Sequence, residues 1–297
     1  MSCTLSPSTG RPYGVLLVLQ ELEIARSTFY AARARRHEPG PRGKRGPRTQ
    51  YNDAELLERI RQVLAESPFV GEGHRKAWAQ LRATGVRSSK PRVLRLMREA
   101  NLLAPTRATR VLGPRNHDGT IITERPDQMW GTDMTTVQTR LEGQAAVFVA
   151  VDHCTAEGVG IHAAKDANRF EALEPIRQGV RNHFGAYDAG VAAGLTARHD
   201  NGSQYVSGVF QDELTFLGIQ SSPSFVRAPE GNGCAERFIR TLKEQLLWLR
   251  LFDTVEELRL ALHAWLKIYN ERWLVERHGH RTPAQVRRDL LAQKAAA

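Results

Sequence analysis

Cysteine is scarce in this sequence of 297 residues. The three cysteines, Cys3, Cys154 and Cys234, are too few and too scattered for a disulfide framework or for a Cys-x-x-Cys zinc site. This usage is typical of a reducing compartment, so we expect a cytoplasmic protein.

Long apolar stretches are missing as well. No segment approaches the roughly 18 uninterrupted apolar residues of a membrane-spanning helix. The N-terminal stretch also lacks the charged start, apolar middle and cleavage site of a signal peptide. We expect no membrane partner. The hydrophobic content of 41% is enough for two or three small folded units with a core.

Acidic residues are too few to balance the basic ones, and the imbalance lies in one part of the chain. The net charge is +10. Residues 1–125 hold 23 Lys and Arg against 11 Asp and Glu, whereas residues 126–297 hold 19 against 21. An excess of positive charge favours a polyanionic partner. We therefore expect DNA to be gripped by the first part, and carboxylate chemistry in the second.

The N-terminal part is predicted to be helical. Residues 14–36 suggest a short helix, a turn and a second helix opened by Ser27 and Thr28, whose hydroxyls can cap free amides. Half of a helix-turn-helix unit and an ordinary helical hairpin with a basic end fit this pattern equally. Residues 37–50 hold three Pro, three Gly and four Arg or Lys, which predicts a basic linker. Residues 1–50 are thus one predicted segment.

A second helical unit is predicted over residues 51–112. Apolar residues recur at helical spacing in three stretches, at Leu56, Leu57, Ile60 and Val63, then Trp78 and Leu81, then Val93, Leu96 and Met97. The third stretch follows Ser88 and Ser89 and displays arginines. A recognition helix in the DNA major groove has this form, and so does a solvated basic helix. The DNA-binding candidates on it are Arg92, Arg95 and Arg98.

After Pro126 strands alternate with helices, which predicts an α/β domain over residues 124–290. The expected order is three strands, helix, strand, helix, strand, helix. Its strands are predicted at residues 130–137, 145–152, 159–163, 194–199 and 219–222, and its helices at 168–184, 204–217 and 234–249. This order matches a ribonuclease-H-like fold, a five-stranded mixed sheet with flanking helices.

Three carboxylates are placed to meet in such a fold. Asp133 lies on the first strand, Asp200 at the end of the fourth, and Glu236 on the first turn of the last helix, with 35 residues between the last two. Because the first and fourth strands are neighbours in this sheet, we expect the three acids to converge. Carboxylate oxygens suit Mg²⁺ or Mn²⁺, and two such ions serve phosphoryl transfer on nucleic acid.

Basic and amide side chains accompany the third acid. On the helix that begins near Cys234, Arg240 and Lys243 share the face of Glu236. They are predicted to contact DNA phosphates. The preceding Gly-Asn-Gly turn is predicted to be mobile over a DNA end, and Asn232 in it is a further predicted DNA contact.

Neighbouring polar residues are interpreted as structural. Asp152 ends the buried second strand and serves as a hydrogen-bond acceptor, while His153 and His199 are satisfied packing histidines. Cys234 is a small residue at a helix start.

Several motifs together resemble one known family. They are WGTDMT at 130–135, HDNGSQY at 199–205, GNGCAERFIRTLKEQ at 231–245 and YNERWLVERHGHRTPAQ at 269–285. The chain resembles the catalytic subunit of bacterial insertion-sequence transposases from about residue 14 to 290. More narrowly, it resembles the second-reading-frame (OrfB-type) product of the IS-three family, whose core is similar to retroviral integrases.

The resemblance implies roles and partners. Asp133, Asp200 and Glu236 would be the metal-binding catalytic triad, with two Mg²⁺ or Mn²⁺ ions, and Lys243 would assist DNA binding. It further implies a helix-turn-helix partner from an upstream frame, a homo-multimer on DNA and association with the bacterial nucleoid.

Two other functions remain open at this point. A DNA-binding regulator without chemistry would use the basic front part, and a ribonuclease-H-like nuclease would use the acids.

Overall fold

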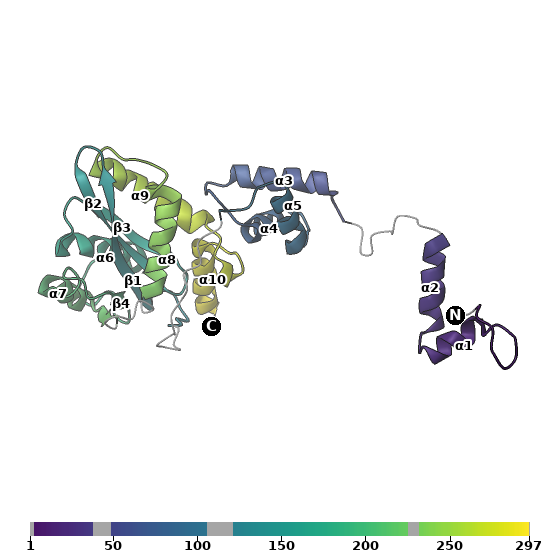
Figure 1. Cartoon of the computed structure of the whole chain (residues 1–297). Coiled ribbons are helices and arrows are strands. Elements are labelled where there is room, and N and C mark those ends of the chain that lie inside the picture. Colours follow the sequence, from purple (N-terminus) through teal and green to yellow (C-terminus); the bar gives the residue numbers. More distant parts are fainter. Residues whose placement is uncertain (1–2, 38–48, 106–120, 225–231, 297) are drawn as a thin grey trace. The chain divides into compact units, whose positions relative to one another are not determined.

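The computed structural model describes residues 3–37, 49–105, 121–224 and 232–296 (Figure 1). It divides into two compact units, Met1–Thr49 and Gln50–Ala297. The predicted basic linker at 37–50 falls largely outside the described residues, as does Gly231 of the predicted mobile turn. No helix among the described residues has the length and apolar character to cross a membrane.

The first unit is a helical hairpin of α1 (Gly14–Glu21) and α2 (Arg26–His37). The second helix begins at Arg26, so Ser27 and Thr28 lie inside its first turn and the prediction that they open it is off by one residue. Leu19 is buried, whereas Leu16, Leu17 and Leu22 are exposed. Two short helices leave most of their apolar surface open because they have too little chain to cover it.

The second unit starts with three helices, α3 (Asp53–Glu66), α4 (His74–Ala83) and α5 (Lys90–Glu99), as predicted. Asn52 and Glu55 form a capping box at the start of α3. The Ser89 side chain accepts a hydrogen bond from the Arg92 amide, which confirms the predicted start of α5. The three helices share one apolar core made of Leu56, Ile60, Ala77, Leu81, Val86, Val93, Leu96 and Met97.

A five-stranded mixed sheet forms the centre of the part of the second unit that follows these helices. Its strands are β1 (Met129–Thr139), β2 (Gly143–Asp152), β3 (Gly158–Ala164), β4 (Thr196–His199) and β5 (Gln220–Pro223). Their order is β3-β2-β1-β4-β5. The pairs β1/β2 and β2/β3 are antiparallel, and β1/β4 and β4/β5 are parallel. The predicted ribonuclease-H-like sheet, with its first and fourth strands adjacent, is therefore confirmed.

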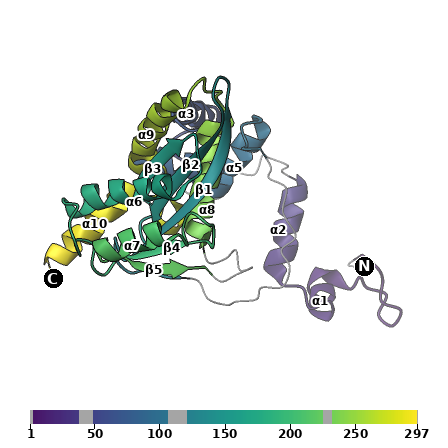
Figure 2. The ribbon, with the colours of Figure 1, turned by 90° about the vertical axis from the view of Figure 1, so that its left-hand side faces the viewer.

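Helices cover both faces of this sheet (Figures 1 and 2). One face carries α6 (Arg169–Phe184) and α7 (Gly208–Leu217), which pack on Trp130 and Phe148. The other carries α8 (Gly233–Leu242), its π-helical continuation η2 (Lys243–Leu247) and α9 (Val255–Arg272). A short 3₁₀ turn η3 (Glu276–His278) and helix α10 (Pro283–Ala296) complete the chain.

Strand β2 is buried on both sides, which explains its continuous apolar sequence. Ala146, Phe148 and Ala150 join the core under α6 and α7, whereas the alternate residues Val147 and Val149 join the core under α8 and α9. At the neighbouring strand, a Cβ on Gly160 would lie 2.0 Å from the Pro175 carbonyl oxygen, so only glycine lets α6 approach β3 this closely. These contacts fix the sheet on which the acids are placed.

Candidate active site

Asp133 lies in the middle of β1, opposite Val149 of β2. Because opposite residues of an antiparallel pair point to the same face, its side chain lies on the face covered by α8 and α9. It is half-buried, and its Oδ1 accepts a hydrogen bond of 2.8 Å from the Met134 amide. The carboxyl group is therefore held at the edge of the core rather than in open solvent.

Asp200 follows β4 directly, and its backbone is held firmly. Gly131 of β1 pairs with Arg198 of β4 in the parallel register. Asp133 and Asp200 each lie two residues further along, so the register places them side by side. The ring of His199 contacts the Asp200 carbonyl oxygen through Nδ1 (2.6 Å) and Ser221 Oγ through Nε2 (2.9 Å). His199 is thus a satisfied packing histidine, as predicted. The Asp200 side chain is exposed and accepts a hydrogen bond from the Gly202 amide at 2.9 Å.

Glu236 lies in the first turn of α8, at the position predicted for it. Its carboxylate is exposed, while Phe238, Ile239 and Leu242 of the same helix are buried against the sheet. Although the residue as a whole is exposed, partial burial of its carboxyl group raises the pKa of Glu236. A negative charge in a first helical turn is also favoured by the helix dipole.

The three acids interact electrostatically around Asp133. The pKa of Asp133 is raised to about 6, chiefly by burial and in addition by the negative charges of Asp200 and Glu236, against the opposing effects of the Met134 amide and Lys243. The structure thus brings the predicted acids and the predicted lysine into one neighbourhood. Within the described residues, however, no three His, Cys, Asp or Glu side chains are grouped closely enough to hold a metal ion.

The donor set fits a hard divalent cation in its chemistry. All three side chains offer carboxylate oxygens, which are the ligands that Mg²⁺ and Mn²⁺ prefer. Their mutual repulsion at Asp133 is the electrostatic condition that a cation relieves. Asp133, Asp200 and Glu236 are therefore the residues that could hold such ions.

Lys243 and Arg240 lie further along the helix that carries Glu236. Lys243 is half-buried and begins the π-helical turn η2. Arg240 is exposed and pairs with Glu244 at 3.1 Å. The predicted regular helix to residue 249 is therefore corrected at Lys243, where the hydrogen-bond pattern widens. Such turns are frequent at functional sites.

The arginines of α5 differ in what they contact. Arg92 donates to Asp53 Oδ1 at 2.8 and 2.6 Å and to the Tyr51 carbonyl, and its side chain is only 16% exposed. Arg95 pairs with Asp53 and Glu99 at the surface. Arg98 is exposed. In this structure Arg92 is a structural tie between α5 and α3, and Arg98 is the arginine most open to a phosphate.

Asn232 also differs from its predicted place in a mobile turn over DNA. It is 4% exposed, and its Nδ2 donates a hydrogen bond of 3.0 Å to the Thr132 carbonyl oxygen. A side chain buried in this way faces the protein, so the structure gives Asn232 a packing position instead of a DNA-facing one.

Asp152 is structural, as predicted. It is fully buried and accepts hydrogen bonds from the amides of Asp127 and Thr155 and from the Thr155 hydroxyl. His153 is buried as well, but its Nε2 has no hydrogen-bond partner within the described structure. The expectation of a satisfied packing histidine is therefore wrong for His153.

Tyr205 is a site residue that sequence reasoning missed. It is fully buried and stacks on His199 with ring centroids 5.7 Å apart. Burial raises the pKa of Tyr205, and the charges of Asp133 and Asp200 raise it further. A buried neutral phenol thus lies within electrostatic reach of two of the acids, in the core under α6 and α7. Its position at the end of the HDNGSQY segment is the only sequence signal for it.

The helical segment also contacts the helix of the active site. The Gln245 side chain pairs with the Val70 backbone, accepting from its amide at 2.9 Å and donating to its carbonyl at 3.0 Å. The Lys76 ammonium lies over the Trp273 ring, 2.8 Å from its centroid. The first contact connects the α3–α5 segment to the π-helical turn that starts at Lys243, and the second connects it to the C-terminal end of α9.

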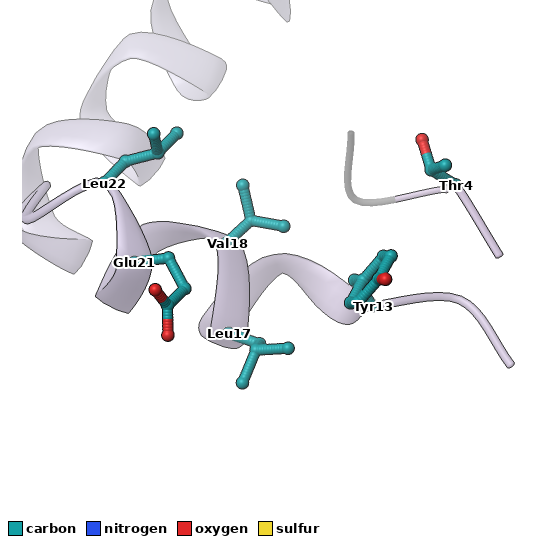
Figure 3. Close-up of a pocket in the computed structure, with 6 residues that line it drawn as sticks. All are labelled: Thr4, Tyr13, Leu17, Val18, Glu21 and Leu22. Carbon is teal, nitrogen blue, oxygen red and sulfur yellow. The ribbon is translucent and has the colours of Figure 1, made fainter. Parts of the chain in front are cut away.

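The N-terminal hairpin has a pocket of about 370 Å³ (Figure 3). Apolar side chains dominate its lining, which consists of Thr4, Tyr13, Leu17, Val18, Glu21 and Leu22. A single carboxylate beside leucine and valine provides no constellation for phosphoryl transfer. The acids around Asp133 are therefore the candidate site.

Comparison with known families agrees with this architecture. Models described as an integrase core domain match residues 123–229 and 217–283, and a model described as an HTH-like domain matches residues 50–110. The fold and the acids thus define an integrase-core protein with a helix-turn-helix-like segment in front.

The chain is 30% identical over 291 residues to the transposase for insertion sequence element IS629 of Shigella sonnei, covering 94% of this chain and 93% of that protein. It is 28% identical over 294 residues to transposase InsD of the IS2 elements of Escherichia coli, covering 96% and 93%. The chain belongs to the family of insertion-sequence transposases.

Retroviral structures are among the solved structures that resemble it. A chain of the simian T-cell lymphotropic virus intasome is 21% identical, with a TM-score of 0.47 and coverage of 71% of this chain and 70% of that one. The HTLV-2 integrase catalytic core in complex with magnesium is 20% identical, with a TM-score of 0.41 and coverage of 55% and 97%.

Proposed function

We propose that this protein is a DNA transposase that cuts the ends of an insertion sequence and joins them to target DNA. Within its family we assign it to the IS-three group, as the second-reading-frame (OrfB-type) catalytic subunit. Asp133, Asp200 and Glu236 are the proposed catalytic residues. One observation carries the proposal. On a ribonuclease-H-like sheet, Asp200, Glu236 and Lys243 all lie near enough to Asp133 to shift its pKa.

The acids are proposed to hold two Mg²⁺ or Mn²⁺ ions. Bound there, such ions would polarise the attacked phosphodiester and favour deprotonation of the attacking oxygen. The protein itself places the ligands: β1 holds Asp133, the His199 ring holds the Asp200 backbone, and α8 presents Glu236. Burial lowers the pKa of His153 and of His199, so neither carries a positive charge that would offset the carboxylates at neutral pH.

Two successive displacements account for cutting and joining. In the first, a water oxygen bonds to phosphorus at the element's end and the bond from phosphorus to the 3′ oxygen breaks. In the second, the freed 3′ oxygen bonds to a target phosphorus and a target 3′ oxygen leaves. The number of phosphodiester bonds is unchanged in the second step, so no energy source is required.

Positive side chains are proposed to place the DNA. Lys243 is near enough to Asp133 to lower its pKa, so an ammonium there can contact the phosphate next to the reacting one. Arg240 and Arg98 are exposed and can contact phosphates further along. Arg95 can also contact a phosphate once its surface ion pairs with Asp53 and Glu99 are released.

Recognition of the element's ends is proposed to involve a helix-turn-helix partner from the upstream frame. Joining two ends in one reaction further favours a homo-multimer on DNA. We place the protein at the nucleoid, where its substrate lies.

The test is end cleavage and joining by the purified full chain. A labelled DNA end with Mn²⁺ and the partner protein is treated with wild type, with Glu236→Gln and with Glu271→Gln, an exposed control on α9. We expect Glu236→Gln to lower the rate by at least about 100-fold because one ligand charge is lost, and the control to match wild type. Binding without cleavage by wild type would indicate a regulator, and cleavage confined to RNA–DNA hybrids would indicate a nuclease.

A further inference from the structure

Asn232 stands at the N-terminal cap of α8 without capping it. Asparagine at this position ordinarily accepts a hydrogen bond from an amide of the first turn. Here the side chain makes no such bond. Its Nδ2 instead donates to the Thr132 carbonyl of β1 at 3.0 Å, in the buried interior. Asn232 therefore does not cap its own helix, and its side chain links α8 to β1 instead.

The cross-link joins the two elements that carry two of the proposed metal ligands. Thr132 immediately precedes Asp133 on β1. Asn232 precedes Glu236 by four residues, which is about one helical turn. The bond from Asn232 to β1 therefore holds the start of α8, and with it Glu236, at one position along the strand.

Gly131 creates the space in which a second interaction can form. A Cβ at Gly131 would lie 2.7 Å from His153 Nε2 and 2.9 Å from Asn232 Oδ1. Both atoms are therefore close to one point above β1, on the face of the strand that also carries Asp133. Both are buried, and neither has a hydrogen-bond partner among the residues that the structure describes.

Backbone hydrogen bonds hold His153 in place beside this point. Its amide donates to the Met129 carbonyl at 2.9 Å, and Arg277 donates to its carbonyl at 2.6 Å. The pKa of His153 is lowered to about 4, chiefly by burial and in addition by the positive charges of Arg277 and Arg198, so the ring is neutral. A neutral ring with its proton on Nε2 is a donor, and Asn232 Oδ1 is an acceptor.

We infer that Asn232 and His153 are positioning residues that latch the first turn of α8 to β1 over Gly131, and so set the separation of Asp133 and Glu236. The inference rests on the proposed function, because it assigns the latch to the proposed catalytic acids. Asn232 supplies the bond to the strand. His153 Nε2 does not bond to Asn232 Oδ1 in the structure, but both atoms lie near one point over Gly131. A shift of either side chain would let Nε2 donate to Oδ1, which would fix the orientation of the amide and give both buried polar atoms a partner.

The test measures Mn²⁺ binding by the full chain, from the electron paramagnetic resonance signal of free Mn²⁺. We expect Asn232→Ala to weaken Mn²⁺ binding roughly 10- to 100-fold, the effect of losing a residue that orients metal ligands. Asp133→Asn is the reference for loss of the site. Asn270→Ala is the matched control, because Asn270 also bridges helix and strand, at Gly158 on the far strand β3. It should lose thermal stability but keep the Mn²⁺ affinity.

A conservative pair of variants tests the histidine. The Nε2 of glutamine can donate from nearly the same place as histidine Nε2, whereas leucine cannot donate. His153→Gln should therefore retain Mn²⁺ affinity within about threefold, and His153→Leu should lose affinity as Asn232→Ala does. Thermal melting of both variants shows whether either has failed to fold.

The outcomes separate this inference from the proposed function. If Asp133→Asn leaves Mn²⁺ binding unchanged, the proposed site is wrong. If Asp133→Asn abolishes binding while Asn232→Ala and His153→Leu bind like wild type, the site stands and the latch is overturned.

Discussion

At the scale of single residues, Asp133 combines two environments that oppose its charge. Its neighbours Thr132 and Thr135 are buried, and two other acids lie close by. A carboxylate in this place destabilises the metal-free fold, because burial and like charge both favour the protonated form. The same two effects favour a divalent cation once one is available.

The pKa of Asp133 predicts how the stability of the metal-free protein depends on pH. It is about 6 in the folded protein against 3.8 for an ordinary aspartate. Between these values the folded state binds more protons than the unfolded state, so stability falls as pH rises from about 4 to about 6. Above pH 6 the ionised Asp133 destabilises the folded protein by the full amount.

Asp133→Asn should therefore stabilise the protein in EDTA at pH 7.5, by up to about 3 kcal/mol, since each pKa unit corresponds to about 1.4 kcal/mol. Differential scanning calorimetry should show the gap to wild type shrinking as pH is lowered toward 4. Addition of Mn²⁺ should raise the melting temperature of wild type and not of the variant. Equal melting at pH 7.5 in EDTA would show that Asp133 is solvated instead of buried.

At the scale of elements, the sequence was sufficient for the strands and the order of the sheet. The run AAVFVAVD predicts a strand buried on both faces, and β2 is one. The placement of Asp133, Asp200 and Glu236 followed from that order because a carboxylate within a strand, at a strand end or at a helix start is placed by its element alone.

Interactions between distant elements could not be predicted in the same way. Arg92 and Asp53 are 39 residues apart, and nothing in the pattern of either helix shows that they pair. Asn232 has the sequence signature of a loop or cap residue, and its bond to Thr132 exists only because α8 packs on β1. The π-helical turn at Lys243 likewise has no signal in the helical periodicity.

The last helix, α10, depends on one such distant interaction. Arg287 contacts Asp127 through both terminal nitrogens, at 2.5 and 3.1 Å, and approaches Glu157 at 3.5 Å. Although burial by itself raises the pKa of Asp127, hydrogen bonds from His183 and Arg287 outweigh it and hold that pKa well below its usual range. Arg287 is the guanidinium that compensates this buried charge.

Arg287→Met should destabilise the protein by about 3–5 kcal/mol, because it leaves the buried Asp127 carboxylate without its guanidinium partner. Urea unfolding followed by circular dichroism measures the change. Arg281→Met is the matched control on a surface pair, Arg281–Asp289, whose side chains are 51% and 49% exposed. It should cost less than about 1 kcal/mol. Similar losses of stability in the two variants would contradict a special role for Asp127.

At the scale of the whole molecule, the charge asymmetry of the sequence matches the division of tasks in the structure. The sheet and its acids lie in the part of the chain with a slight negative excess, so most of the net attraction for phosphate has to come from residues 1–125, beyond the local contacts proposed for Arg240 and Lys243. The helical segment α3–α5 uses part of its positive charge in internal pairs such as Arg92 with Asp53. The N-terminal unit, with nine Arg and Lys against three Asp and Glu over residues 1–49, becomes correspondingly more important for DNA affinity.

Removal of residues 1–49 should therefore separate stability from DNA binding. The unit Gln50–Ala297 contains all three apolar core clusters, whereas Leu19 is the buried apolar residue described in the first unit. The truncated chain should melt within about 1–2 °C of the full chain, because it retains the surface buried on folding. Its affinity for a nonspecific DNA duplex should fall, and the slope of log affinity against log salt should become less steep by about 0.9 for each phosphate that the protein no longer neutralises.

A milder change tests the same positive charge within the full chain. Replacing Arg33, Arg35 and Arg36 by glutamine removes three of the nine basic residues of the first unit, so it should flatten the salt dependence by part of the amount seen on truncation. An unchanged salt slope in the truncated chain would place the DNA grip entirely within residues 50–297. A large fall in the melting temperature of the truncated chain would instead show that residues 1–49 stabilise residues 50–297. An independent unit would not change the melting of the other unit.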